Sequence, residues 1–417
     1  MFAKLFRQPD VPEKYRSNFS HLYLDIAWFG VLSGSSVSFL SVYATRLGAS
    51  ALQIGLLSGM SAVVPLFLAI PAGRWLEKQS TDRAVFWSSV IFRIGYAFWI
   101  PLPWLFNAQG QIWTLITLTF LMAIPFTALG VGFNALFAEA VPERYRSQVA
   151  GMRNVTFAIA FMITSFGIGY LLKYLPFPTG YQIMFGIGAF GAAMSSYHIY
   201  HVRPIREKIP ALQASPESPP EHKGALPNTV ASILRLDIWK TRFRNVLIAL
   251  FLFHLTHLLT NPIYPLYKVR VLQLNDANLG NGTALYYLTV LIASTQLRRV
   301  VHRFGHKKVT AFGVMGMCIY PIMLALAQNI AQYYFLSLLG GFVWALVNGA
   351  YANYLLENIP PDDRPTHLAW YNIILNVAIL TSSLAAPAIA ETTGLFNALI
   401  IFGVLRIFAG FAILKWG

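Results

Sequence analysis

The chain has few charged residues, and those it has are mostly basic. Only 11% of its 417 residues are Asp, Glu, Lys or Arg, whereas about 25% is usual in soluble domains. Lys and Arg number 31 against 16 Asp and Glu, which gives a net charge of +15. A basic chain could bind nucleic acid, but no polar region long enough to fold as a domain is present. We therefore expect neither an ordinary soluble fold nor a nucleic-acid partner.

Cysteine is almost absent, and so are the usual cofactor motifs. Cys318 is the single cysteine, which excludes an intramolecular disulfide framework and a cysteine-based metal cluster. No Gly-x-x-x-x-Gly-Lys-Ser/Thr loop is present to hold the phosphates of ATP. An enzyme embedded in a membrane would need several acids, histidines or cysteines converging at one depth. We therefore expect no ATP hydrolysis, no cofactor, no metal and no enzymatic activity.

Long apolar runs are what the chain has instead. Apolar residues make up 56% of it, and runs near ~20 residues recur, each long enough to cross a bilayer core as a helix. Spanning segments of this kind must be helical, because backbone groups find no other hydrogen-bond partners in lipid. The sequence predicts an all-α integral membrane protein in contact with the lipid bilayer. The twelve predicted spans are 20–43, 51–73, 84–106, 111–138, 149–172, 180–200, 243–267, 278–297, 309–328, 331–356, 368–389 and 394–414.

The basic residues predict an orientation. Four of them fall in loops after odd-numbered spans, two lie inside spans and the other 25 fall on the opposite side. Because basic residues concentrate on the cytoplasmic side of membrane proteins, we expect that side to hold both termini. The segment 202–240 contains six prolines among polar residues, and such a composition does not fold alone. We therefore expect N-terminal and C-terminal six-helix bundles over 1–201 and 241–417, joined by a cytoplasmic linker loop over 202–240.

One stretch of sequence recurs after 218 positions. The segment Glu139–Ser165 aligns with Glu357–Ser383, so that an acid, a proline, an arginine and a serine coincide. Repeats of such long period indicate a duplicated structural unit. Many secondary transporters are built from two repeated halves, with the substrate site near the middle of the membrane. The repeat therefore predicts two pseudo-symmetric halves.

Two loops carry related motifs. Gly73, Glu77 and Lys78 follow the second predicted span, and Arg303 and Gly305 follow the eighth. Each loop resembles a degenerate copy of the G-x-x-x-D-R-x-G-R-R motif of the major facilitator superfamily. Together with the twelve spans, the repeat and the central loop, these motifs make the whole chain resemble a bacterial-type twelve-span member of that superfamily.

The resemblance implies a function and two gates. It implies a monomeric secondary active transporter in the cytoplasmic (inner) membrane, which moves a small-molecule substrate by alternating access with a proton or another coupling ion. In that superfamily, the motif charges hold the cytoplasmic helix ends together in the outward-open state. Lys78 would then lie near Glu139, and Arg303 near Glu357. The implied gating residues are Gly73, Glu77, Lys78, Glu139, Arg146, Arg303, Gly305, Glu357 and Arg364.

The resemblance also implies that spans 1, 4, 7 and 10 line a central cavity. The polar candidates on these spans for the substrate or proton pathway are Asp25, Asn134, His254, His257, Asn261, Tyr264, Asn348 and Tyr351. Asp25 is the one carboxylate well inside a predicted span, where it would either carry a proton or pair with a nearby arginine. His254 and His257 lie one turn apart and would line the cavity, pack between helices or bind a metal.

Two alternatives stay open. One is efflux of multiple drugs or toxic compounds by proton antiport, although the fifth span lacks the G-x-x-x-G-P-x-x-G-G pattern of antiporters in that superfamily. The other is a membrane sensor that keeps the scaffold but does not transport.

Arg93 and Arg406 lie inside spans 3 and 12, where we expect them to pack or to extend towards the membrane surface.

Overall fold

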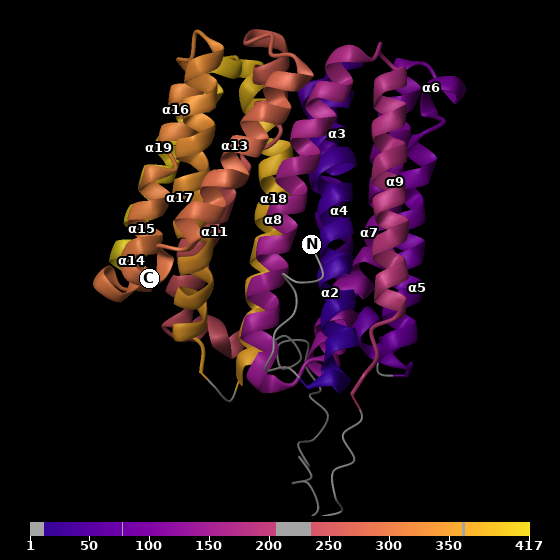
Figure 1. Ribbon diagram of the computed structural model, residues 1–417. Helices are drawn as coiled ribbons and strands as arrows, with labels where there is room; N and C mark the ends of the chain where they lie inside the picture. The colour runs from indigo at the N-terminus through magenta and orange to yellow at the C-terminus, as the bar shows by residue number, and fades with distance from the viewer. Residues whose placement is uncertain (1–11, 77, 206–234, 361–362) are drawn as a thin grey trace, which may run out of the picture.

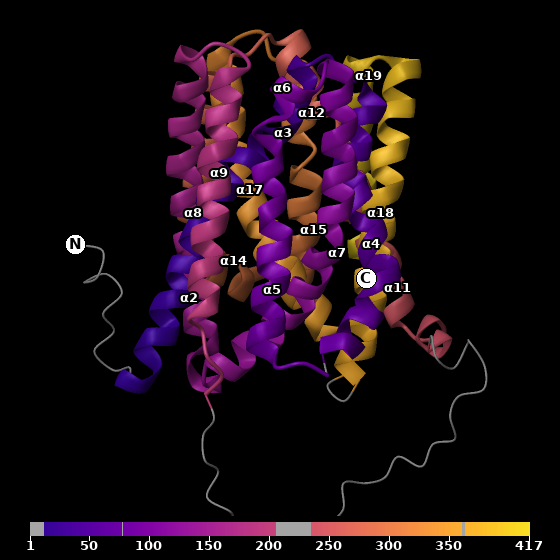
Figure 2. The ribbon, with the colours of Figure 1, turned by 90° about the vertical axis from the view of Figure 1, so that its right-hand side faces the viewer.

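The structure is a computed structural model that describes residues 12–76, 78–205, 235–360 and 363–417. All regular secondary structure in these residues is helical, and the helices run side by side along one axis (Figures 1 and 2). We call residues 12–205 the first half and residues 235–417 the second half. The chain leaves the first half and enters the second at the same end of the bundle, which we call the linker end (Figure 1). The opposite end is the far end.

The helices of the first half alternate in direction between the two ends (Figure 1). Their bounds are α2 Glu13–Leu32, η1 Ser33–Val37, α3 Ser38–Arg46, α4 Ala51–Leu76, α5 Thr81–Ile94, η2 Gly95–Trp99, α6 Leu102–Leu105, α7 Ala108–Ala140, α8 Glu143–Tyr174 and α9 Thr179–Tyr200. Those of the second half are η3 Leu236–Lys240, α11 Phe243–Leu258, α12 Ile263–Leu266, η4 Tyr267–Val271, α13 Asp276–Ser294, α14 Leu297–Phe304, α15 His306–Gly316, α16 Ile319–Ala325, α17 Ile330–Glu357, α18 Arg364–Thr393 and α19 Leu395–Trp416.

Nine helical segments within the described residues are long and apolar enough to cross a membrane. Three predicted spans, 84–106, 180–200 and 278–297, are not among them. The first is interrupted by η2, and the helices α9 and α13 carry polar residues such as Ser195 and Asp276 that are buried inside the bundle. The all-helical membrane fold is therefore confirmed, and the count of twelve spans stays a prediction for these three segments. Most of the predicted linker, residues 206–234, lies outside the described residues.

The two halves cross each other at two places where glycines allow very close contact. At the first crossing, a Cβ atom on Gly280 of α13 would lie 2.5 Å from the carbonyl oxygen of Ser165 on α8. At the second, a Cβ atom on Gly55 of α4 would overlap the carbonyl oxygen of Ser383 on α18. Ser165 and Ser383 are equivalent positions of the 218-residue repeat. The repeated segments therefore contribute one helix to each crossing, α8 to the first and α18 to the second.

Close backbone approach at small residues is a common way to pack helices in lipid, where no hydrophobic force draws them together. We therefore expect Gly169→Ala on α8 to destabilise the protein, because its Cβ atom would lie 2.8 Å from the carbonyl oxygen of Asp276. Overpacking of this kind typically lowers the free energy of unfolding by about 1–3 kcal/mol. Gly167→Ala is the matched control, since a Cβ atom there meets nothing within 4 Å. Thermal unfolding in detergent would contradict the account if both variants melted alike.

Candidate transport site

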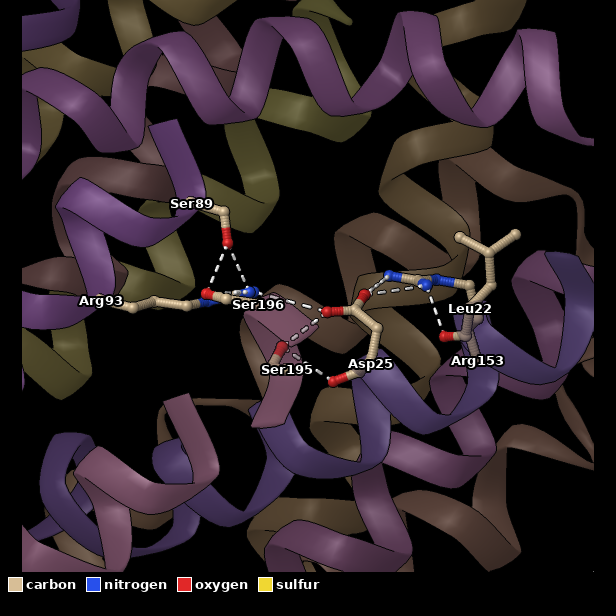
Figure 3. Close-up of polar contacts among 7 residues, drawn as sticks. All are labelled: Leu22, Asp25, Ser89, Arg93, Arg153, Ser195 and Ser196. Atoms are coloured by element: carbon tan, nitrogen blue, oxygen red, sulfur yellow. Dashed lines mark hydrogen bonds and ion pairs between the residues drawn. The ribbon is translucent and has the colours of Figure 1, made fainter. Parts of the chain in front are cut away.

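Asp25 lies in a buried cluster of charges inside the first half. Its carboxylate sits between Arg93 of α5 and Arg153 of α8, as Figure 3 shows. The closest N–O distances are 3.5 Å to Arg93 and 3.2 Å to Arg153. The hydroxyl of Ser195 on α9 donates to the same carboxylate at 2.6 Å. Four helices therefore converge on one carboxylate, which is 2% exposed.

The two arginines are also held by neutral partners. Arg93 donates to the hydroxyl of Ser89 at 2.6 Å and to that of Ser196 at 3.3 Å. Arg153 donates to the backbone carbonyl of Leu22 at 2.6 Å (Figure 3). Of the two alternatives for Asp25, this geometry corresponds to the acid paired with arginine. Of the two expectations for Arg93, packing corresponds to the structure and extension to the membrane surface does not, because the side chain is buried and points to Asp25.

A cavity of about 370 Å³ lies inside the second half. Its wall comes from α11, α12, η4, α13, α15, α16, α17 and α19, and it is largely aromatic. Two cations line it, Arg406 from α19 and Lys268 from η4, and none of the described residues in its wall is acidic. We call it the second-half cavity. Its volume is at the small end of the range found for small-molecule sites.

Arg406 is 2% exposed and has no carboxylate partner among the described residues. It donates instead to the backbone carbonyl of Met317 at 2.7 Å, to that of His257 at 3.1 Å and to the hydroxyl of Thr260 at 2.6 Å. These dipoles hold the guanidinium in place but leave its positive charge without a counter-ion. Of the two expectations for Arg406, packing corresponds to this position and extension to the membrane surface does not. That the side chain also faces a cavity was not predicted, because a span prediction does not tell which face a residue occupies.

Lys268 and His257 are the other notable polar groups of the wall. The ammonium of Lys268 lies 5.4 Å from the ring centres of Tyr264 and Tyr333 and 5.7 Å from that of Tyr320. His257 stacks on Trp344 with ring centres 4.9 Å apart, and its enclosed Nδ1 atom has no hydrogen-bond partner. Cation–π contacts partly stabilise an ammonium but do not neutralise it.

The predicted pathway residues separate into four places. His257, Asn261 and Tyr264 line the second-half cavity. His254 lies instead against α18, where its Nε2 atom is 2.9 Å from the hydroxyl of Tyr371, and Tyr351 packs on the His254 ring. Asn134 and Asn348 are exposed and outside this cavity, and Asp25 belongs to the charge cluster. No group of three metal-ligating side chains occurs among the described residues.

At the far end, polar contacts join the two halves. Asp276 of the second half lies 2.9 Å from the Nη2 atom of Arg46, and it accepts a hydrogen bond from the Tyr181 hydroxyl at 2.8 Å. Arg46 also donates to the backbone carbonyl of Leu274 at 3.2 Å. Arg270 of the second half donates a hydrogen bond to the backbone carbonyl of Ala49 in the first half at 2.5 Å. We call these four side chains, with the backbone carbonyls of Leu274 and Ala49, the far-end latch.

At the linker end, Glu139, Glu357 and Arg146 of the predicted gates contact residues of their own half. Glu139 accepts from the Thr81 hydroxyl at 3.0 Å, and Glu357 lies 2.6 Å from the Nδ1 atom of His306. Arg146 donates to the carbonyls of Val141 and Ala138 and so satisfies the end of α7.

Lys78, Arg303 and Arg364 are exposed, and within the described residues they form no ion pair. The predicted neighbour of Glu357 was Arg303, and the structure places His306 there. Gly305 has a φ of +77°, which favours glycine at the joint between α14 and α15. A Cβ atom on Gly73 would meet nothing within 4 Å, and Glu77 lies outside the described residues.

The charge cluster makes a prediction about stability. Asp25→Asn would leave two buried guanidinium groups without an acid, and removing one member of a buried ion pair typically lowers stability by about 3–5 kcal/mol. Arg93→Met would leave a matched pair of Asp25 and Arg153, so we expect a smaller loss. Denaturant or thermal unfolding in detergent would compare the two. Equal losses, or a larger loss for Arg93→Met, would contradict this account of the cluster.

Comparisons with known proteins agree with this architecture. The model of the Major Facilitator Superfamily matches residues 26–280 and 246–416. The "Cis,cis-muconate transport protein" of Acinetobacter baylyi is 21% identical over 288 residues, which cover 67% of this chain and 66% of that protein. The "Multidrug resistance protein 2" of Bacillus subtilis is 24% identical over 126 residues, 30% of each chain. The chain thus aligns with less than two thirds of the length of either relative.

Solved structures share the fold at low sequence identity. A D-xylose–proton symporter is 15% identical with a TM-score of 0.71, over 96% of this chain and 97% of the other. The nucleoside transporter NupG is 12% identical with a TM-score of 0.66, over 97% and 100%. The xylose transporter XylE of E. coli, in an inward open conformation, is 16% identical with a TM-score of 0.67, over 95% of each. With the family model matching nearly its whole length, the chain belongs to the Major Facilitator Superfamily.

Proposed function

We propose that the chain is a secondary active transporter that moves a small solute across the cytoplasmic membrane by alternating access. The observation that carries the proposal is the difference between the two ends of the bundle. At the far end, the latch of Arg46 and Asp276 joins the halves. At the linker end, the contacts of Glu139 and Glu357 stay within one half each.

This difference is what one state of an alternating-access cycle requires, closed at one end and open at the other. The distribution of basic residues supports a cytoplasmic linker end with both termini on that side. With that orientation, we propose that the structure represents an inward-facing state. The two glycine crossings supply the pivots, because Gly280 and Gly55 let backbones slide in contact without interlocking side chains.

The outward-open state would need new contacts at the linker end. The exposed Lys78 and Arg303 are available for them, since they form no ion pair among the described residues in this state. We propose that both approach acids at the linker end when it closes. Ion pairs near a surface typically contribute about 0–1 kcal/mol each, so such a gate could open in every cycle.

We further propose that a proton drives transport. The curated relatives are named for muconate transport and for multidrug resistance, and a solved relative for xylose–proton symport. Of the two curated relatives, the muconate protein aligns over 67% of the chain and the multidrug protein over 30%, which favours transport of an organic acid over drug efflux. A protonophore should then abolish uphill accumulation of the solute in vesicles, whereas a sensor would show no saturable uptake at all.

The far-end latch provides the test of alternating access. Asp276→Asn removes the charge that Arg46 pairs with, and a hydrogen bond to a charged group contributes about 1.5–3 kcal/mol. We expect a population in which the far end is open, seen as longer distances between spin labels at Ala108 and Gln328. These two exposed positions lie at the far end of different halves.

Asp82→Asn is the matched control. It makes the same change in an ion pair, but with Arg203 of the same half and at the linker end. Its far-end distances should equal those of the parent protein. If Asp276→Asn also left them unchanged, the latch would be an ordinary surface contact and this basis for alternating access would be lost.

A further inference from the structure

We propose that the second-half cavity binds a small organic anion, whose carboxylate lies at Arg406 and whose planar, unsaturated body lies among the aromatic rings. The inference rests on the proposed function as a transporter of an organic acid, and it adds the binding site, the residues that would hold the carboxylate and the planar shape of the solute. It concerns binding alone, so it is measured separately from transport. Four properties of the cavity support it: its charge, its unused hydrogen-bonding capacity, its walls and its place beside the other half.

The charge of the cavity is the first support. Arg406 and Lys268 face it, and no described residue of its wall is acidic. In the first half, by contrast, the buried Arg93 and Arg153 share the carboxylate of Asp25. Buried charges in proteins are normally paired, because removal from water is costly. A bound anion would give Arg406 and Lys268 the counter-charge that the described residues of the cavity wall do not provide.

Two polar groups in the wall have unused hydrogen-bonding capacity: an N–H of Arg406 and the Nδ1 atom of His257, which donates when it carries the ring proton. The Nη1 atom of Arg406 carries two N–H groups and makes one hydrogen bond, to the carbonyl of Met317. The Nδ1 atom of His257 is enclosed and has no partner in the structure. Both residues line the cavity. A carboxylate accepts bonds from several donors at once, and charge-assisted bonds of this type are roughly twice as strong as neutral ones.

The walls suit a flat and largely apolar body. The aromatic side chains that surround the space are Tyr264, Tyr286, Tyr287, Tyr320, Tyr333 and Trp344. Aromatic rings pack well on planar unsaturated groups, and their hydroxyls add polar contacts at the rim. Lys268 lies over three of these rings, where it could receive a second carboxylate. Two cations without an acid therefore favour a dianion over a monoanion.

The cavity also touches the interface that must move during transport. Tyr287 belongs to its wall and stacks on Phe161 of α8, with ring centres 4.2 Å apart. Phe161 lies one turn from Ser165, where α8 crosses α13 at Gly280. A ligand in the cavity would therefore contact, through Tyr287, the helices of the first crossing. Its binding could then favour one conformational state of the transport cycle over the other.

Binding can be measured on the purified full chain with three planar compounds of related shape. Terephthalate is a dicarboxylate, benzoate a monocarboxylate and terephthalamide the neutral counterpart of the first. We expect terephthalate to bind more tightly than benzoate, terephthalamide at least 10-fold more weakly than terephthalate, and sulfate to compete poorly. Binding would be followed by thermal stabilisation of the purified chain. Equal binding of terephthalate and terephthalamide, or of sulfate and terephthalate, would overturn the inference.

Variants locate the site. Lys268→Gln should weaken terephthalate at least 10-fold and benzoate less, whereas Arg406→Lys should weaken both. Lys173→Gln is the matched control, because Lys173 also lies over a tyrosine ring, at 5.4 Å from Tyr174, but outside the cavity. If Arg406→Lys fails to fold, the anion site is still tested by Lys268→Gln and by the comparison of terephthalate with terephthalamide. Saturable uptake of a neutral solute without binding of either carboxylate would refute the anion site and leave the transport proposal standing.

Discussion

The contact that the rest of this structure depends on is the close approach of backbones at two crossings between the halves. Gly280 lies against the carbonyl of Ser165, and Gly55 against that of Ser383. Helices in lipid gain little from burying apolar side chains against each other, so tight packing at small residues holds them together. At such crossings the backbones are in close contact without interlocking side chains. In our proposal, the two halves rock about these contacts, and polar contacts at the two ends set the free-energy difference between the states.

Buried charge is balanced in three different ways in this chain. Asp25 is shared by two arginines within one half, which fixes four helices in place. Asp276 and Arg46 balance each other across the halves, so their pairing depends on the state of the far end. Arg406 has only carbonyl and hydroxyl partners and no acid. We propose that these three arrangements serve a structural role, a conformational role and a ligand-binding role, respectively.

Much of the architecture could be predicted from sequence, because long apolar runs and a repeat leave few alternatives. Ser165 and Ser383 were found as a repeated pair, and the structure adds that both lie where the halves cross. The partners of single charges could not be predicted in this way. The arginines that pair with Asp25 come from positions 68 and 128 residues away, and nothing in the local pattern joins them.

The direction in which a side chain points from its helix is the other property that could not be predicted from the sequence. His254 and His257 are one turn apart and were expected on one face, yet one contacts Tyr371 and the other lines the cavity. Residues three apart on a helix differ by about 60° in direction, which is enough to separate them between two neighbours. For the same reason a peripheral helix could present Arg406 inward. Its direction depends on how α19 packs, and this becomes visible only in three dimensions.

The most direct test of alternating access is to measure distances between the two halves at both ends of the bundle, in protein that carries no change other than the spin labels. Spin labels at Gln79 and Arg298 would report the linker end, and labels at Ala108 and Gln328 the far end. All four positions are exposed, and each pair has one member in each half. If the halves rock about the two crossings, conditions that lengthen the far-end distance will shorten the linker-end distance. Distances that lengthen together at both ends, or that never change, would contradict the account.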